Sequence, residues 1–321
     1  MVRELLKVEN LKTYFFTEEG VVKAVDGVTF DIKRGEIFCL VGETGCGKSV
    51  TALSIMRLVR PPGKIVDGKI IFEGKDLLKL NEEEMREIRG KRIAMIFQNP
   101  LTSLNPVFTI GFQVGEPLEV HEKLSSNKIR KIVINLLRRV RIPDPEIRVN
   151  AYPHQLSGGM RQRSMIAMMI SCKPSLLIAD EPTTALDVTI QAQILKLIIE
   201  LKDELGSAIL LITHDFGVVA EVGDRVGVMY LGNLVELGNV EDLFREPMHP
   251  YTRGLLNALP LKLKRKSMLE TIPGSLSSPI NPPPGCKFHP RCKYAMPVCS
   301  KLPPPQVYVG NDRWVACHLY N

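Results

Sequence analysis

The hydrophobic and polar positions near the start of the chain predict short strands followed by a helix. Residues 5–8 open a strand, and the apolar run at 35–42 is typical of a buried strand that ends at glycine. A helix is expected from Lys48 to about Arg60, where two prolines and a glycine stop it.

The pattern then changes from mixed structure to helix. A strand at 69–72, a charged helix at 81–90 and a strand at 92–97 precede a long stretch, 99–172, that is predicted to be mainly helical. That stretch ends in an apolar helix at about 158–171.

Strands and helices alternate regularly in the next part of the chain. Apolar strands are predicted at 175–180, 208–213 and 225–230, with helices at 189–205 and 216–221 between them. Continuous apolar strands that alternate with helices indicate a parallel sheet covered on both faces. The expected fold class is therefore α/β.

The texture changes again beyond Pro260, where ten of the 23 prolines occur. Because proline cannot donate to a hydrogen-bond ladder, this tail is predicted to contain neither a regular helix nor a central strand. We expect it to be extended, and either disordered or held in place by something other than an apolar core.

The amino-acid composition is that of an ordinary globular protein. Hydrophobic residues make up 45% and charged residues 24% of its 321 residues. No apolar run approaches the roughly 20 residues that span a bilayer, and the first residues lack the apolar segment of a signal peptide. We expect a protein that stays in the cytosol.

The net charge of +7 lies entirely in the tail. Residues 261–321 carry nine Lys or Arg against Glu270 and Asp312, so the rest of the chain is formally neutral. A basic tail suits nucleic acid, a membrane surface or an acidic partner, and equally a solvated end that promotes solubility.

The chemistry begins with GETGCGKS, which matches the phosphate-binding pattern G-x-x-x-x-G-K-[ST] between a predicted strand and a predicted helix. Its glycines let successive N–H groups face the phosphates of a nucleotide at the positive end of the helix. Lys48 should reach the β- and γ-phosphates, and Ser49 should hold Mg²⁺. The residues of this phosphate loop are Gly42, Glu43, Thr44, Gly45, Cys46, Gly47, Lys48 and Ser49.

Two carboxylates end the predicted strand at 175–180. Asp180 is placed to hold Mg²⁺, and Glu181 is placed to act as the base that activates water for ATP hydrolysis. A helix-capping role for the acidic pair is the alternative.

The sequence LSGGM at 156–160 opens the apolar helix. With the phosphate loop, the acidic strand, FQNP at 97–100, ALD at 185–187 and ITHD at 212–215, it resembles an ATP-binding cassette over about residues 3–240. The resemblance implies a P-loop NTPase fold with a RecA-like parallel-sheet core, an N-terminal antiparallel β part and an inserted helical subdomain at about 99–172. A cassette at 1–240 would then precede a Pro- and Cys-rich C-terminal extension at 241–321.

Roles for further residues follow from that resemblance. Ser157, Gly158 and Gly159 would bind the γ-phosphate of ATP held by a second subunit, in a dimer that encloses two ATP molecules. The fifth signature position, usually Gln, is Met160 here, so a water-mediated contact from Gln is absent.

The same resemblance assigns four more positions. Gln98 would touch Mg²⁺ or the attacking water, His214 would bond the γ-phosphate and orient Glu181, and Asp187 would pass between the subunits. An aromatic residue near the N-terminus should stack on adenine, and the candidates are Phe15 and Tyr14.

Three longer segments narrow the resemblance to the ATPase subunits of the dipeptide/oligopeptide importer family: FQNPLTSLNP at 97–106, LSGGMRQR at 156–163 and HPYTRGLLNALP at 249–260. The family implies two transmembrane permeases, an extracytoplasmic binding protein and a second ATPase, either a paralogue or an identical chain. It also implies a place on the inner face of the cell membrane, with the segment around 98–106 as the permease socket.

Other readings stay open. Relatives in this family import nickel or oligosaccharides, so the substrate is not fixed by the motifs. Soluble cassettes that act on nucleic acid or the ribosome form a different class, but they usually carry coiled-coil insertions or two cassettes per chain, and we expect no nucleic-acid partner. A P-loop kinase or GTPase would leave LSGGM and His214 unexplained.

Four cysteines cluster in the tail: Cys286, Cys292, Cys299 and Cys317. In a reducing cytosol this favours a four-thiolate metal site over disulfides, with free thiols as a further alternative, although the spacing is neither that of zinc ribbons nor that of bacterial ferredoxins. The family resemblance favours a [4Fe–4S] cluster, with zinc second. Within the phosphate loop, the positive potential is expected to favour the thiolate of Cys46, and the favoured alternative is a small side chain that the loop merely tolerates.

Overall fold

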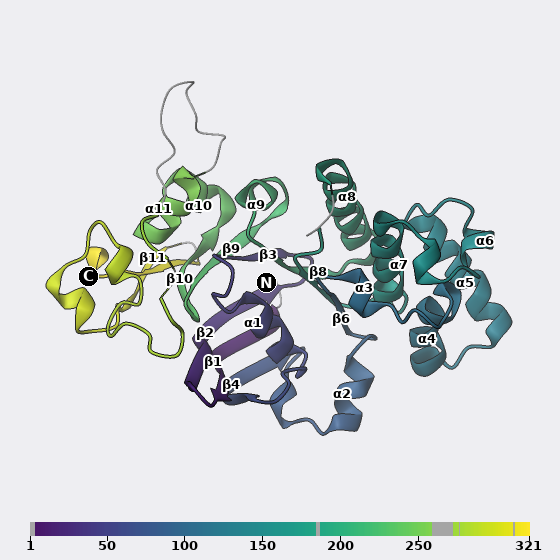
Figure 1. The fold of residues 1–321 in the computed structure, drawn as a ribbon, viewed down its shortest axis with the longest axis horizontal. Coiled ribbons are helices and arrows are strands. Elements are labelled where there is room, and N and C mark those ends of the chain that lie inside the picture. Colours follow the sequence, from purple (N-terminus) through teal and green to yellow (C-terminus); the bar gives the residue numbers. More distant parts are fainter. Residues whose placement is uncertain (1–3, 184–186, 259–271, 276, 311) are drawn as a thin grey trace. The chain divides into compact units, whose positions relative to one another are not determined.

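A computed structural model describes residues 4–183, 187–258, 272–275, 277–310 and 312–321. The chain forms two compact units (Figure 1). The first consists mainly of residues 79–211, and the second of residues 4–32, 36–78 and 212–321. The predicted division at residue 240 falls inside the second unit and stays a prediction.

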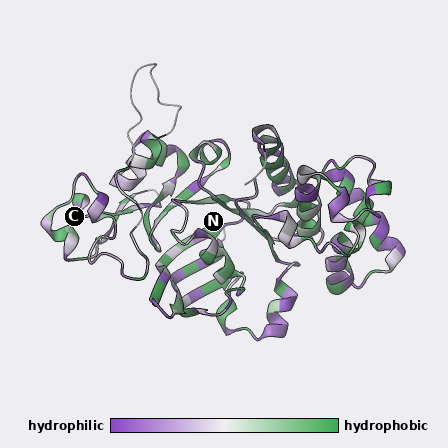
Figure 2. Cartoon of the chain, in the orientation of Figure 1, coloured by the Kyte–Doolittle hydropathy of each residue, from purple (hydrophilic) through white to green (hydrophobic). Residues whose placement is uncertain are grey.

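The second unit contains a four-stranded sheet in the order β2-β1-β4-β5, whose β1–β4 and β4–β5 pairs are antiparallel. Apolar side chains of β1 such as Leu5, Leu6 and Val8 are buried, while their neighbours reach solvent. Figure 2 shows this mixture of green and purple residues along the strands. The strands are β1 (Glu4–Thr17), β2 (Gly20–Lys33), β4 (Gly63–Phe72) and β5 (Lys75–Asp76).

The second unit also holds strands in the order β11-β12-β10-β9-β3, in which only β3 and β9 are parallel. β3 is buried at all five positions, as expected for a strand covered on both faces. The strands are β3 (Ile37–Val41), β9 (Arg225–Tyr230), β10 (Asn233–Asn239), β11 (Gln306–Gly310) and β12 (Arg313–Ala316).

The helices of the second unit follow its strands. α9 packs on β3, and α10 packs on β9 and β10. The α-helices are α1 (Lys48–Ile55), α9 (Phe216–Val222), α10 (Val240–Arg245) and α11 (Pro250–Asn257). Short 3₁₀ turns lie at Leu77–Lys79, His289–Arg291, Pro297–Ser300 and His318–Tyr320.

The first unit joins the parallel strands β6 and β7, and β8 beside β7, to a group of helices. α7 packs on α3, α4, α5 and β6, so the helical group has α7 at its centre. The strands are β6 (Ile93–Ile96), β7 (Leu176–Asp180) and β8 (Ala208–Thr213). The helices are α2 (Glu82–Ile88), α3 (Pro100–Ser103), α4 (Ile110–Glu122), α5 (Ser126–Arg139), α6 (Pro145–Arg148), α7 (Gly158–Ile170) and α8 (Val188–Leu205), with a 3₁₀ turn at Pro153–Gln155.

Two helix and strand boundaries differ from those predicted. α1 ends at Ile55, before the proline pair, because Arg57 adopts a left-handed backbone with φ 52° that closes the helix. β4 then begins at Gly63 and is longer than the strand expected at 69–72.

The prediction for the tail was wrong in one respect. After the last of its prolines, β12 pairs with both β10 and β11, so it is a central strand, and its four residues are buried. Trp314 and Val315 join the apolar core, and it is the proline-free stretch that makes this possible. The basic residues at 262–266 lie outside the described part of the chain. Among the described residues, no helix has the length and hydropathy required to cross a membrane.

Candidate active site

The phosphate loop connects β3 to α1 in the second unit, as predicted. Gly42 and Gly47 have φ angles of 152° and 110°, and a Cβ atom on either would lie within 2.2 Å of a backbone oxygen, that of Met229 or Ala24. Only glycine fits these two positions. The loop therefore curls tightly into the N-terminus of α1.

Lys48 points back into the loop. Its Nζ donates to the carbonyl oxygen of Gly42 at 2.7 Å and of Glu43 at 3.1 Å, and the side chain is buried. The ammonium group thus lies in the concavity of the loop, where a phosphate oxygen could replace these carbonyls.

The loop has partners that the sequence analysis missed. The hydroxyl of Tyr251 accepts a hydrogen bond from the backbone N–H of Glu43, and the guanidinium group of Arg291 pairs with the Glu43 carboxylate. Tyr251 belongs to the His-Pro-Tyr segment at 249–251. This motif was the sequence signal that could have pointed to Tyr251. The sequence marked Arg291 only as one of the basic residues near the tail cysteines, not as a partner of the phosphate loop.

The two candidates for the adenine contact lie side by side in β1. The Tyr14 hydroxyl donates to Asp26 at 2.7 Å, and Lys23 Nζ lies 5.7 Å from the centre of the Tyr14 ring. The Phe15 ring instead packs near Gly63, where a Cβ would lie 2.6 Å from it. Burial and the hydrogen bond to Asp26 raise the pKa of Tyr14. The adenine contact stays a prediction for both residues.

The acidic pair in the first unit has the expected position. Asp180 is the buried last residue of β7, and Glu181 follows with a left-handed φ of 45°. That conformation is unusual outside glycine and commonly marks a functional position. It brings the Glu181 carboxylate to Gln98, whose Nε2 donates to Oε2 at 3.0 Å. The structure thus brings two of the predicted catalytic residues together.

The signature segment lies at the start of α7 in the same unit. Ser157 caps the helix, its hydroxyl accepts from Met160 N–H at 3.3 Å, and Ser157 and Gly158 are exposed. An exposed helix N-terminus with a serine and glycines can receive an anion from outside the chain. Further along α7, buried Gln162 donates to the carbonyl oxygen of Pro182 at 2.7 Å, which ties the helix to the segment after Glu181.

Asp187 and His214 lie at the starts of α8 and α9. Asp187 caps α8 by accepting from Ile190 N–H at 2.9 Å. Ala185 and Leu186, the other two residues of the ALD motif, lie outside the described residues. His214 is exposed and directly follows β8. It belongs to the second unit and Glu181 to the first, so its role in orienting Glu181 stays a prediction.

For Cys46 the structure favours the alternative of a tolerated small side chain. Its side chain is buried, and burial raises the pKa of the thiol more than the nearby Lys48 lowers it. Lys48 Nζ lies 3.8 Å from the sulfur, but the low dielectric of the site disfavours the thiolate. Burial thus works against an activated thiol at this position.

The four tail cysteines gather in one place in the second unit. Cys286 interacts electrostatically with each of the other three thiols, and Cys292 and Cys317 each interact with Cys299. Burial raises the pKa of Cys286 to about 11 and raises the pKa values of Cys292 and Cys317.

Each of these sulfurs also receives a backbone N–H. Met296 N donates to Cys299 Sγ at 3.5 Å, and the donors to the sulfurs of Cys286, Cys292 and Cys317 are the N–H groups of Phe288, Tyr294 and Leu319. Four thiols with N–H donors suit a thiolate metal site in their chemistry. Within the described residues, however, no three His, Cys, Asp or Glu side chains are placed to share one metal ion.

Comparison with protein families assigns both parts of the chain. Residues 25–184 match the family described as ABC transporter, and residues 235–299 match the oligopeptide/dipeptide transporter C-terminal region. Over 99% of its length the chain is 55% identical to the "Probable peptide ABC transporter ATP-binding protein y4tR" of Sinorhizobium fredii, covering 95% of that protein. The chain belongs to the ABC transporter family.

Further ABC transporter proteins agree with this assignment. The dipeptide transport ATP-binding protein DppD of Bacillus subtilis is 51% identical over 99% of this chain and 95% of its own length. The oligopeptide transport ATP-binding protein AppD of the same organism is 52% identical over 98% of this chain and 97% of its own length.

A solved ABC transporter cassette has the same fold. The structure of MJ0796, a dimer in a post-hydrolysis state bound to ADP and phosphate, is 28% identical, covers 74% of this chain and 99% of that chain, and superposes with a TM-score of 0.66. The expected cassette fold and the ATPase class are thereby confirmed for this ABC transporter protein.

Proposed function

We propose that this chain is the ATPase subunit of an importer of dipeptides and oligopeptides. The observation that carries the catalytic part is the 3.0 Å hydrogen bond between Gln98 and Glu181, next to Asp180 at the end of β7. The peptide substrate is supported by the names of relatives that cover nearly the whole chain and by the matching C-terminal region.

Lys48 and the N–H groups of the phosphate loop hold the phosphates, and Glu181 accepts a proton from the attacking water. Gln98 holds the Glu181 carboxylate in place and is the residue through which the nucleotide state reaches the permeases. His214 would bond the γ-phosphate.

The oxygens of Ser49, Asp180 and Gln98 suit Mg²⁺, which prefers hard oxygen ligands. Buried Asp180 at a strand end has the chemistry required of such a ligand. When bound, the ion neutralises charge that develops on the transferred phosphoryl group.

A second ATPase, either a paralogue or an identical chain, would complete each site. The exposed N-terminus of α7, with Ser157, Gly158 and Gly159, is proposed to bind the γ-phosphate of the ATP molecule held by the second subunit. Asp187 at the start of α8 lies in the segment proposed to pass between the subunits.

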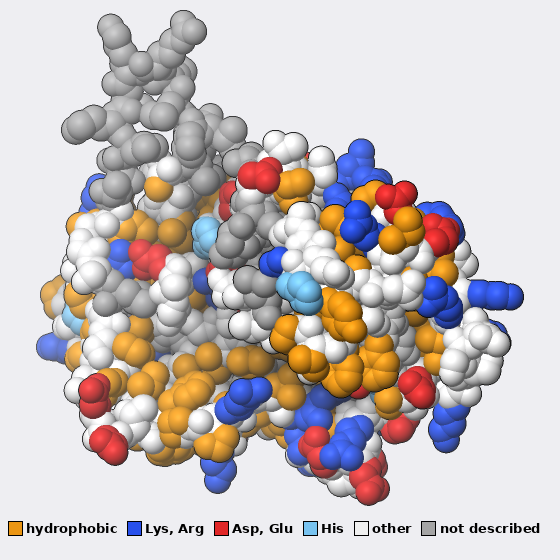
Figure 3. All heavy atoms as spheres, turned by 45° about the vertical axis from the view of Figure 1, so that its right-hand side comes forward, with side chains coloured by type: hydrophobic (Ala, Val, Ile, Leu, Met, Phe, Trp, Pro, Cys, Tyr) orange, Lys and Arg blue, Asp and Glu red, His pale blue; other side chains and the backbone are white. Residues whose placement is uncertain are grey.

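Two transmembrane permeases, served by an extracytoplasmic binding protein, are the proposed membrane partners, which places the chain on the cytoplasmic face. Support comes from exposed apolar side chains just after the segment at 98–106: Val107 is 69%, Phe108 43% and Phe112 49% exposed. The rings of Phe108 and Phe112 stack at 4.7 Å and form a ready apolar contact. Figure 3 shows basic and acidic side chains interspersed around apolar ones on one face of the molecule.

The first test is the variant Glu181→Gln. The substitution keeps the size and the hydrogen bond to Gln98 but removes the base, so the variant should bind MgATP and dimerise with turnover reduced at least 100-fold. ATPase rates and gel filtration with ATP measure this, with Glu83→Gln on the surface of α2 as the matched control. Turnover within a few-fold of the original chain would remove Glu181 from the base role.

The substrate is tested in membranes that contain the two permeases and the binding protein. ATP-dependent uptake of a labelled dipeptide, lost in Glu181→Gln, is expected. Uptake of nickel or an oligosaccharide instead would keep the ATPase and overturn the peptide assignment. Retention on nucleic acid without crosslinking to a permease would overturn the importer.

We further propose that Cys286, Cys292, Cys299 and Cys317 hold a [4Fe–4S] cluster. Support comes from the convergence of the four thiols and from the N–H donors to their sulfurs. Anaerobically purified protein should contain about four irons and four sulfides per chain, and Cys292→Ser should lose them. Stoichiometric zinc, or no metal, would overturn the cluster.

A further inference from the structure

We propose that Arg291 is a positioning residue for ATP binding, which holds Glu43 and thereby the phosphate loop in place from the C-terminal extension. The inference rests on the ATP site proposed above. It also assigns a role to the His-Pro-Tyr segment, which the hydrolysis mechanism does not use.

The pair between Arg291 and Glu43 is bidentate. Nη1 of Arg291 lies 2.7 Å from Oε2 and Nη2 lies 2.9 Å from Oε1 of Glu43, the second residue of the phosphate loop. The Arg291 side chain is 6% exposed and that of Glu43 29%. This fork-to-fork geometry fixes the direction of the carboxylate, which a single contact would leave free to rotate. The pair also raises the pKa of Arg291.

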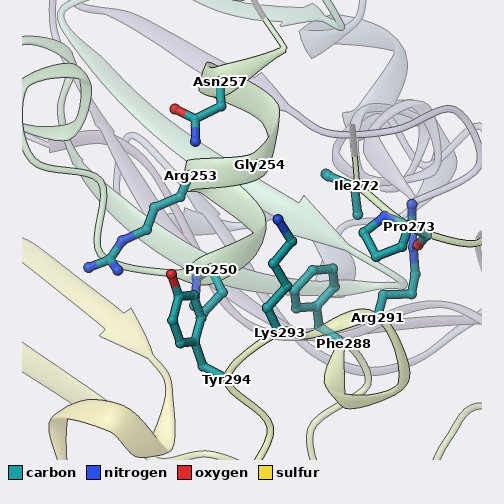
Figure 4. A pocket seen from close by; sticks show the side chains of 10 residues that line it. All are labelled: Pro250, Arg253, Gly254, Asn257, Ile272, Pro273, Phe288, Arg291, Lys293 and Tyr294. Atoms are coloured by element: carbon teal, nitrogen blue, oxygen red, sulfur yellow. The ribbon is translucent and has the colours of Figure 1, made fainter. Parts of the chain in front are cut away.

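Arg291 is itself held by the extension. Its Nε donates to the carbonyl oxygen of Pro273 at 2.9 Å, and its guanidinium lies 5.9 Å from the ring centre of Tyr230 in β9. A cavity of about 150 Å³ is lined by Arg291, Phe288, Ile272 and Pro273, among others (Figure 4). Because its position is set by these neighbours, Arg291 is a fixed point for the loop.

The His-Pro-Tyr segment holds the same loop residue by its backbone. The hydroxyl of fully buried Tyr251 accepts from Glu43 N–H at 2.8 Å. The Tyr251 ring packs against Tyr230 at 4.8 Å and against Phe288 at 5.3 Å. Glu43 is therefore fixed at its side chain and at its backbone by residues from α11 and from the segment between Cys286 and Cys292.

That cysteine segment makes a second contact on the nucleotide-binding part. Lys287 Nζ donates to Asp26 at 3.0 Å, and Asp26 accepts the hydroxyl of Tyr14, one of the two adenine candidates. Lys287 and Arg291 thus bridge from one short segment to both expected ends of the nucleotide.

The position of Glu43 matters because it is the second residue of the phosphate loop, directly after Gly42. If Glu43 moves, the loop N–H groups and Lys48 lose the arrangement that receives phosphates, and ATP affinity should fall. Glu181 belongs to the other unit and has its own support from Gln98, so the hydrolysis step should be preserved once ATP is bound. The expected signature is a raised KM with kcat unchanged.

The test measures MgATP binding by calorimetry on full-length chains that carry Glu181→Gln to prevent turnover. Arg291→Gln should weaken ATP binding roughly tenfold, and Glu43→Gln by a similar factor. Because the two residues act on each other, the double variant should be little weaker than either single one. Arg291→Lys keeps the charge but loses the fork, and should fall in between. In the active chain, Arg291→Gln should raise KM about tenfold with kcat within twofold.

Arg253→Gln is the matched control. Arg253 donates to the Pro247 carbonyl and the Tyr320 hydroxyl within the extension, and neither partner is in the loop. The ATP affinity of the Arg253→Gln variant should stay within about twofold of that of the parent chain. Equal weakening by Arg253→Gln, additive effects in the double variant, or unchanged affinity in a folded Arg291→Gln chain would each overturn the proposal. Absence of ATP binding in the parent Glu181→Gln chain would instead contradict the proposed ATP site itself.

Discussion

Glu236 is a carboxylate without any exposed surface, which is unusual for a charged residue. It accepts the N–H groups of Met248 and His249 at 2.9 Å each, and Arg313 of β12 donates to it at 3.2 Å. Arg313 also donates to the carbonyl oxygen of Glu246. The buried ion pair therefore fixes both the beginning of α11 and the position of β12.

Arg313→Met should destabilise the protein by about 3–5 kcal/mol, because it leaves a buried carboxylate without its cation. Urea unfolding followed by circular dichroism measures the loss. The double variant Glu236→Gln/Arg313→Met should recover much of it, since it also removes the unpaired charge. A single variant within 1 kcal/mol of the original chain would show that Glu236 does not depend on Arg313.

At the scale of single residues, the sequence predicts where a side chain lies when its motif leaves the residue type only one role. The glycines of the phosphate loop, Lys48 and the pair Asp180-Glu181 could be placed because their order along the chain fixes their chemistry. The environments of Arg291 and Cys46 could not be predicted in this way. Their behaviour depends on residues distant in sequence, Glu43 in the first case and the burying neighbours in the second.

At the scale of elements, α11 shows how a short motif builds a helix start. His249 caps the helix through Nδ1, which accepts from Tyr251 N–H at 3.1 Å, and Pro250 takes the first position. An accepting Nδ1 requires a neutral ring. Burial lowers the pKa of His249 from 6.5 to about 3, so the folded protein keeps the ring neutral where the unfolded chain is protonated.

The cap should therefore fail in acid. His249 contributes its full stability above pH 6.5, and the contribution falls as the pH drops toward 3, because the unfolded chain then binds the extra proton. From pH 7.5 to pH 5 the loss is about 2 kcal/mol at 25 °C. His249→Asn keeps a capping acceptor that does not titrate, so the stability difference between the two chains should shift by that amount in urea unfolding at the two pH values. A pH-independent difference would contradict the lowered pKa.

The other strands differ in what determines them: the local sequence pattern for some, and pairing with neighbouring strands for others. β8 and β9 have the predicted bounds, because each is a mainly apolar run of six residues that follows a helix. β10 and β12 were missed: β10 follows a tight turn after β9, and β12 is a four-residue strand in a proline-rich tail. Such strands depend on the neighbours they pair with, which a local pattern cannot reveal.

For the whole molecule, the cassette could be predicted from six motifs in order, and the comparisons confirm it. The role of the C-terminal extension could not be predicted from the motifs. Its prolines suggested a separate appendage, whereas its described residues contribute to the sheet through β12, to the aromatic cluster through Phe288, and to the phosphate loop through Arg291.

The position of β12 has a consequence for biosynthesis. The ribosome makes β10 long before residues 313–316, so during synthesis one edge of β10 lacks its neighbour and Glu236 lacks its cation. β10 pairs with β9, and β9 pairs with β3, the strand that leads into the phosphate loop. A nascent chain that stops between Asp215 and β12 therefore carries every nucleotide-binding motif but cannot finish the sheet that supports them.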